Sequence, residues 1–121
     1  MMNIKINYIS DFGIPNKERA IFKVHSADNV GRYIALKTTE VLVGRINSNP
    51  SNFYWFPNQD VKTGDFIVLY TGNGVNTKFS NKFGTTTFVF YWGLPKTILN
   101  APKDSIVLIG IDGWEYKSRT L

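Results

Sequence analysis

The sequence predicts a single domain of the all-β class, and three observations support that prediction. Of its 121 residues, 43% are hydrophobic and 15% are aromatic, which is enough apolar material for one packed core. Short segments alternate apolar and polar residues with a period of two, and turn-forming residues separate them. No window of helical length keeps an apolar period of about 3.6 residues. Short strands at this spacing are typical of a sandwich or a barrel, so we expect one such domain over residues 1–121.

The first half of the chain contains four predicted strands, at residues 4–8, 20–25, 32–37 and 41–46. In the first of them, Ile4 and Ile6 alternate with polar neighbours, as in a half-buried strand. In the second predicted strand, at residues 20–25, apolar and polar residues alternate in the same way. Gly44 interrupts the fourth and indicates a bulge or a close approach of two backbones. We expect at most one turn of helix, near residues 16–19.

The second half contains five more predicted strands, at residues 53–56, 66–70, 86–92, 106–111 and 114–116. The apolar run Phe66–Tyr70 has no polar interruption and therefore suits a central strand. Residues 71–85 are rich in Gly, Asn, Thr and Ser, so we expect them to form the longest irregular segment. Asp112-Gly113 is a typical two-residue hairpin turn and predicts that the last two strands pair.

The composition disfavours several kinds of chemistry. Cysteine is absent, which excludes disulfides, thiol nucleophiles and iron–sulfur sites. The single histidine, His25, lies on a predicted strand and offers neither a His-based triad nor a His-rich metal site. No nucleophile and base occur at a spacing that supports a catalytic pair. We therefore expect a protein that is not an enzyme and that holds no cofactor or metal.

No stretch of the chain approaches the roughly 18 apolar residues of a membrane-spanning helix. The N-terminus reaches Lys5 before any apolar run, so it does not look like a targeting segment. We therefore expect no membrane association and a cytoplasmic location.

The net charge of +5 is concentrated in the middle of the chain. Residues 41–103 hold six basic and two acidic side chains, and no acid occurs between Asp65 and Asp104. In that stretch, lysines lie close in the sequence to aromatic residues of a polar loop. We expect the rings of these aromatic residues to be exposed. The candidate binding residues are Lys78, Phe79, Lys82, Phe83 and Lys96.

Two functions fit these residues. Aromatic side chains among lysines are how many proteins hold single-stranded nucleic acid. An exposed aromatic loop equally suits a protein partner or self-association, in which Phe79 and Phe83 would make the contact. We favour a protein partner, and we keep a nucleic-acid-binding β domain as the alternative. A homo-oligomer is compatible with either function.

Part of the chain resembles a known family. The elements that carry the likeness are, in order, Phe56-Pro57, Gly64-Asp65, Phe66–Tyr70, Trp92-Gly93, residues 104–109 and Asp112-Gly113. This order resembles the lamin tail domain over residues 53–113, about half of the chain.

The resemblance implies an immunoglobulin-like β-sandwich of about eight short, mainly antiparallel strands. Lamin tail domains act as non-catalytic binding modules, in nuclear lamins and, in bacteria, often beside secreted nucleases or surface proteins. The chain looks like a stand-alone bacterial or phage relative. The matching residues are mainly structural ones, so the resemblance implies no particular binding site.

Overall fold

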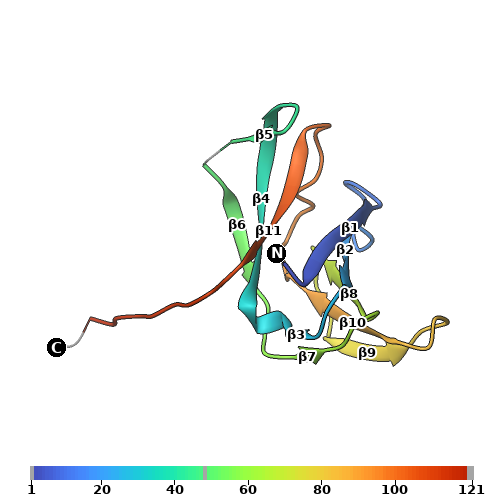
Figure 1. Ribbon diagram of the computed structural model, residues 1–121. Helices are drawn as coiled ribbons and strands as arrows, with labels where there is room; N and C mark the ends of the chain where they lie inside the picture. Colours follow the sequence, from blue (N-terminus) through green and yellow to red (C-terminus); the bar gives the residue numbers. More distant parts are fainter. Residues whose placement is uncertain (1, 48, 120–121) are drawn as a thin grey trace.

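A computed structural model describes residues 2–47 and 49–119. Over these residues the chain is almost entirely β-structure, arranged as a sandwich (Figure 1). The prediction of an all-β sandwich with mainly antiparallel strands is thus confirmed. The elements are β1 (Ile4–Ser10), β2 (Arg19–Val24), β3 (Asp28–Asn29), the 3-10 turn η1 (Val30–Arg32), β4 (Tyr33–Leu42), β5 (Arg45–Ile46), β6 (Ser51–Trp55), β7 (Asp60–Val61), β8 (Phe66–Tyr70), β9 (Thr77–Ser80), β10 (Thr86–Tyr91) and β11 (Asp104–Gly110).

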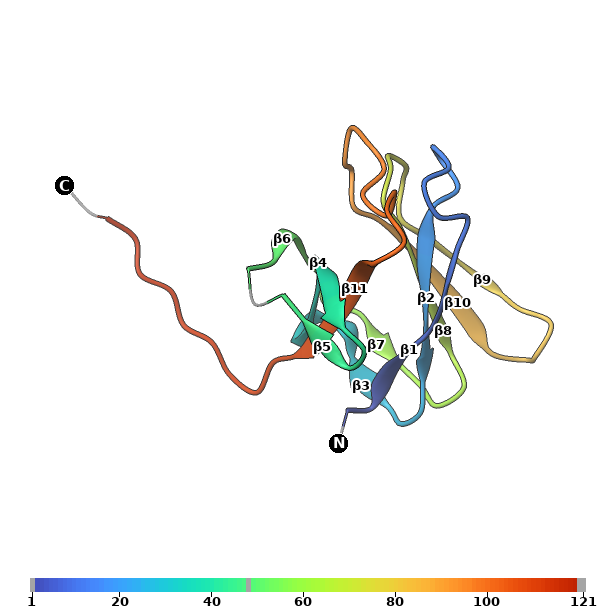
Figure 2. The ribbon, with the colours of Figure 1, turned by 90° about the horizontal axis from the view of Figure 1, so that it is seen from above.

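The larger sheet has five strands in the order β1-β2-β8-β10-β9 (Figure 2). Neighbouring strands are antiparallel except β8 and β10, which run parallel. The uninterrupted apolar run of β8 lies in the centre, as expected, with β2 on one side and β10 on the other. β9 forms an edge of this sheet, so part of the expected irregular segment 71–85 is in fact a strand.

The smaller sheet is built around β4, which is ten residues long. β11 pairs with one edge of β4, while β6 and β5 pair with the other. We expected two strands here with a break at residues 38–40. The strand instead continues through Thr38 and Thr39, whose β-branched side chains suit a strand. The chain turns at Gly44, whose φ of +81° favours glycine, so Gly44 is a turn residue and not a bulge.

The core lies between the inner faces of the two sheets. Phe22, Phe56 and Phe90 pack edge to face, with ring centroids 5.9 Å apart for Phe22 and Phe56 and 5.4 Å apart for Phe56 and Phe90. Such ring pairs stabilise a core beyond the burial of their area. Ile67 and Leu69 of β8 are buried in the same cluster. Because side chains alternate along a strand, the other residues of β8 lie on the outer face of the larger sheet.

A buried carboxylate, that of Glu18, connects three loops at one end of the sandwich. Its oxygens accept hydrogen bonds of 2.8–3.0 Å from the N–H groups of Gly13, Ile98 and Leu99 and from the hydroxyl of Thr71. A buried charge is tolerated when its hydrogen bonds are satisfied in this way. Glu18 therefore holds the loops at this end in place.

Two further expectations about local structure are wrong. The helical turn in the described residues is η1, where the side chain of Asn29 accepts a hydrogen bond from the N–H of Gly31; residues 16–19 form no helix. The expected hairpin at Asp112-Gly113 does not form either. After β11, residues 111–119 run in an extended path away from the sandwich and pair with no described strand (Figures 1 and 2).

Candidate functional site

The structure brings four of the five predicted site residues together and leaves one apart. Lys78 and Phe79 lie on β9, and Lys82 and Phe83 lie in the turn between β9 and β10. All four side chains are exposed, with 54% of Phe79 and 66% of Phe83 accessible to solvent, so the expectation of exposed aromatic rings is confirmed. Lys96 follows the opposite end of β10, about 20 Å away at the usual rise of a strand.

The turn that carries Phe83 is held by its own hydrogen bonds. The side-chain oxygen of Asn81 accepts from the N–H groups of Phe83 and Thr85, at 3.0 and 3.2 Å. Gly84 closes the turn with a φ of +79°. Asparagine at the first position and glycine at the fourth are a common turn signature, so this local order was readable from the sequence. Phe83 is consequently held in one place, with its ring 5.7 Å from that of Phe66 on β8.

A second surface lies on the solvent side of the smaller sheet. The register of β6, β4 and β11 places apolar side chains there in two rows of three. We call this surface the apolar face; its rows are Phe53, Leu36 and Val107, and Trp55, Ile34 and Ile109. The fractions exposed to solvent are 61% for Phe53, 45% for Trp55 and 42% for Ile109, which are large values for residues of these types.

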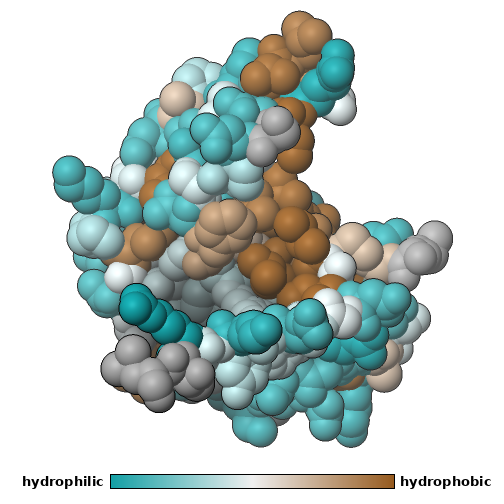
Figure 3. All heavy atoms as spheres, turned by 90° about the vertical axis from the view of Figure 1, so that its left-hand side faces the viewer, coloured by the Kyte–Doolittle hydropathy of each residue, from teal (hydrophilic) through white to brown (hydrophobic). Residues whose placement is uncertain are grey.

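The apolar face continues beyond the two rows at both ends. Leu42 and Ile46 of the β4–β5 hairpin are exposed above it, and Figure 3 shows hydrophobic residues gathered in a hollow on this side of the molecule. Below it, the ring of Trp114 packs edge to face on Trp55, with centroids 4.8 Å apart. The indole N–H of Trp55 donates to the carbonyl oxygen of Gly31 at 2.7 Å, so the polar atom of this side chain already has its partner.

None of the residues of the apolar face was expected at a site from the sequence. Aromatic side chains on strands usually belong to the core, yet Trp55 on β6 is 45% exposed. The signal available was that β4 and β11 carry apolar side chains on both of their faces, although a two-layer sandwich buries only one. Such a doubly apolar strand in an outer layer leaves one apolar face for solvent or for a partner.

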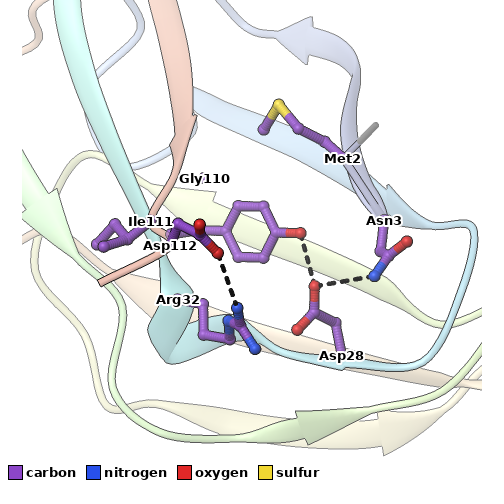
Figure 4. A pocket seen from close by; sticks show the side chains of 8 residues that line it. Met2, Asn3, Asp28, Arg32, Gly110, Ile111 and Asp112 are labelled. Atoms are coloured by element: carbon purple, nitrogen blue, oxygen red, sulfur yellow. Dashed lines mark hydrogen bonds and ion pairs between the residues drawn. The ribbon is translucent and has the colours of Figure 1, made fainter. Parts of the chain in front are cut away.

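A pocket of about 370 Å³ lies between the N-terminus and the end of β11, and Figure 4 shows its lining. The hydroxyl of Tyr33 donates to a carboxylate oxygen of Asp28 at 2.7 Å, and the amide of Asn3 donates to the same oxygen at 3.3 Å. Burial, followed by the hydrogen bond to Asp28, raises the pKa of Tyr33 to about 12. Tyr33 is thus held as a neutral donor to Asp28, and this arrangement fastens the N-terminal segment to β4.

Comparisons of the chain with protein-family models, with curated proteins and with solved structures found no match. Within residues 2–47 and 49–119, no three His, Asp or Glu side chains gather in a way that could hold a metal ion. In the same residues, no helix has the length and apolar character needed to cross a membrane. The exposed residues of β9 and the β9–β10 turn, and the apolar face, are therefore the features that bear on function.

Proposed function

We propose that the protein is a non-catalytic interaction module that forms a homodimer by packing its apolar face against the same face of a second copy. The observation that carries this proposal is the exposure of Phe53, Trp55 and Ile109 on one continuous apolar surface. Monomeric proteins rarely expose a surface of this kind, and where they do it usually marks an interaction site. Two sheets pack face to face about 10 Å apart, so a second sheet would bury both rows.

A second copy is the partner that the chemistry of this face favours. All six residues in the two rows are apolar, so the face requires no opposite charge on its partner and is complementary to itself, as a twofold interface demands. The tail supports the same arrangement. Trp114 packs on Trp55, whereas Tyr116 is 81% exposed. The described tail, which ends at residue 119, extends away from the sandwich, where a partner molecule would lie (Figure 2).

The resemblance of residues 53–113 to lamin tail domains, which are binding modules, supports a non-catalytic role. In this chain the matching residues shape the fold. Gly64 turns the chain with a φ of +92°, and the buried carboxylate of Asp65 accepts hydrogen bonds from the N–H groups of Lys62 and Thr86, at 2.8 and 3.0 Å. We include membership of that family in the proposal.

The molar mass in solution tests the dimer. We expect light scattering after size-exclusion chromatography to give about twice the monomer mass of 13.8 kDa at high protein concentration. Ile109→Lys places a charge on the apolar face, in the row of Trp55 and Ile34, and should return the mass to that of the monomer. Val75→Lys makes the same change at an exposed apolar residue of the β8–β9 loop that belongs to neither row, so this variant should remain dimeric.

Circular dichroism and a cooperative thermal transition would show that both variants fold. The proposal fails if the unmodified protein is monomeric from about 1 µM to about 1 mM, the range that covers association free energies of roughly 8 to 4 kcal/mol. It also fails if Ile109→Lys leaves the dimer intact.

A further inference from the structure

The outer face of the larger sheet, on the opposite side of the sandwich from the apolar face, combines aromatic and basic side chains. The pairing register places its residues in rows that cross the strands. The row nearest the β9–β10 turn contains Phe79, Thr87, Phe66, Lys23 and Lys5. The row at the other end contains Tyr91, Tyr70, Arg19 and Ser10. We call this surface the aromatic-basic face.

Four aromatic rings lie in two pairs: one pair is in the second row, and the other joins Phe66 of the first row to Phe83 of the β9–β10 turn. Tyr70 and Tyr91 are stacked, with centroids 5.1 Å apart and planes 11° from parallel. Phe66 and Phe83 are 5.7 Å apart and tilted. Phe66 and Tyr70 are four positions apart along β8, a distance of about 13 Å at the rise of a strand. The face therefore offers two ring platforms at a fixed spacing.

A cation accompanies each of these pairs. The guanidinium of Arg19 lies 5.6 Å from the ring centre of Tyr70. The ammonium groups of Lys23 and Lys82 lie 5.9 Å from the ring centre of Phe66 and 5.3 Å from that of Phe83, respectively. These contacts hold long, flexible side chains beside the rings, and the charges of Lys23 and Lys82 are available there to a ligand that stacks on the platform.

The charged residues that the register places on the aromatic-basic face are all basic. None of the residues that the register places on it is acidic. The nearest carboxylate shown by the contacts is that of Asp11, which accepts from Arg19 at 2.6 Å and so neutralises that cation. Lys5, Lys23 and Lys82 have no acid recorded within ion-pair distance among the described residues, so the face attracts anions.

We propose that the aromatic-basic face binds single-stranded nucleic acid without strong preference for sequence. In single-stranded nucleic acid, bases can stack on the ring platforms while the phosphates lie beside the cations. An acidic protein surface would contact the cations but would make less use of the rings. The platforms lie on a broad sheet, which cannot reach the bases inside a duplex. The nucleic acid must therefore be single-stranded, with its bases unpaired. This site is independent of the proposed dimer interface because it lies on the other sheet.

Fluorescence anisotropy of labelled twelve-nucleotide dT, dA and U strands, measured over a salt series, tests this proposal. We expect binding at low salt that weakens with added salt, with a log–log slope of about −2 to −3 for three or four phosphate contacts. A duplex of the same length should bind more weakly than the single strands. The proposal is wrong if no strand binds at low salt, or if the duplex binds more tightly.

Paired charge reversals locate the site. Lys23→Glu with Lys82→Glu removes two cations from the aromatic-basic face, and should weaken binding about tenfold or more. Lys96→Glu with Lys103→Glu changes the net charge by the same amount at exposed residues outside the face, and should weaken binding far less. An equal loss in both variants would show attraction by net charge alone and would overturn the proposed site.

Phe83→Ser tests the stacking platform without changing any charge. Because Phe83 is largely exposed in the turn, its replacement should leave the chain folded, which circular dichroism would verify. We expect this variant to lose affinity while its salt slope stays the same, because the phosphate contacts remain. Unchanged affinity in Phe83→Ser would exclude the platform.

Discussion

At the scale of single residues, Tyr33 and Asp28 form a pair whose charges depend on each other. Burial and the hydrogen bond to Asp28 raise the pKa of Tyr33 to about 12. Burial alone would raise the pKa of Asp28 as well. Hydrogen bonds from Tyr33, from the N–H of Asn29 and from Asn3 outweigh that effect and lower the pKa of Asp28 below its usual value. The pair therefore exists as a neutral phenol and a carboxylate over a wide pH range.

This pairing predicts a loss of stability at alkaline pH. An unfolded tyrosine loses its proton near pH 10, whereas Tyr33 in the fold keeps it until about pH 12. The stabilisation is thus complete below pH 10 and is lost as the pH rises toward 12, by up to about 1.4 kcal/mol per pH unit. Urea unfolding at several pH values should show this decrease, and Tyr33→Phe should lack its share of it. The same pH dependence in both proteins would contradict the assignment.

For some single residues, exposure or burial could be predicted from the sequence, and for others it could not. The exposure of Phe79 and Phe83 could be predicted because a polar, turn-rich segment surrounds them. The burial of Glu18 could not, because its hydrogen-bond donors Thr71 and Leu99 lie 53 and 81 residues further along the chain. An aromatic residue on a strand usually belongs to the core, whereas the place of Trp55 on the apolar face follows from strand register, which a single sequence does not reveal.

At the scale of elements, strands were predictable where a period of two or an apolar run was uninterrupted, as in β1, β2 and β8. Predictions were wrong where pairing with a distant part of the chain decides whether a segment becomes a strand. The segment 38–40 looked like a link, but its pairing with β11 and β5 keeps it in β4. Residues 114–116 have strand-like alternation and a good turn before them, yet they have no partner edge in the described chain. A strand requires that edge as well as a suitable sequence.

The β9–β10 turn supplies a prediction at this scale. Asn81 holds the turn through its side-chain oxygen and also donates to the hydroxyls of Thr85 and Thr87. Asn81→Ala removes these bonds, so we expect the free energy of unfolding to fall by about 1–2 kcal/mol. Asn73→Ala, at an exposed residue of the preceding loop, should change it much less. Urea denaturation measures both values, and an equal effect of the two substitutions would contradict the role of Asn81.

At the scale of the whole molecule, the two exposed faces lie on opposite sides of one sandwich and differ in chemistry. The apolar face is uncharged, while the aromatic-basic face draws its cations from the N-terminal part and from the middle of the sequence, with Lys23 and Lys82 brought to adjacent rings. The excess of basic residues in the middle of the chain indicated a charged surface. It did not indicate that Lys5 and Lys23 belong to that surface. In a dimer joined through the apolar faces, the two larger sheets would form the outer layers. A single strand long enough to reach both could then bind more tightly than to one copy.

This arrangement predicts that thermal stability depends on protein concentration. If the folded dimer unfolds to separate chains, mass action raises Tm as concentration rises. A tenfold increase contributes about 0.7 kcal/mol per chain, which for a domain of this size corresponds to a rise of roughly 2–4 °C. Differential scanning calorimetry should show this rise for the unmodified protein and for Val75→Lys. It should show a constant Tm for Ile109→Lys, because that variant unfolds as a monomer. A Tm independent of concentration in the unmodified protein, or equally dependent in all three, would exclude the apolar face as the interface.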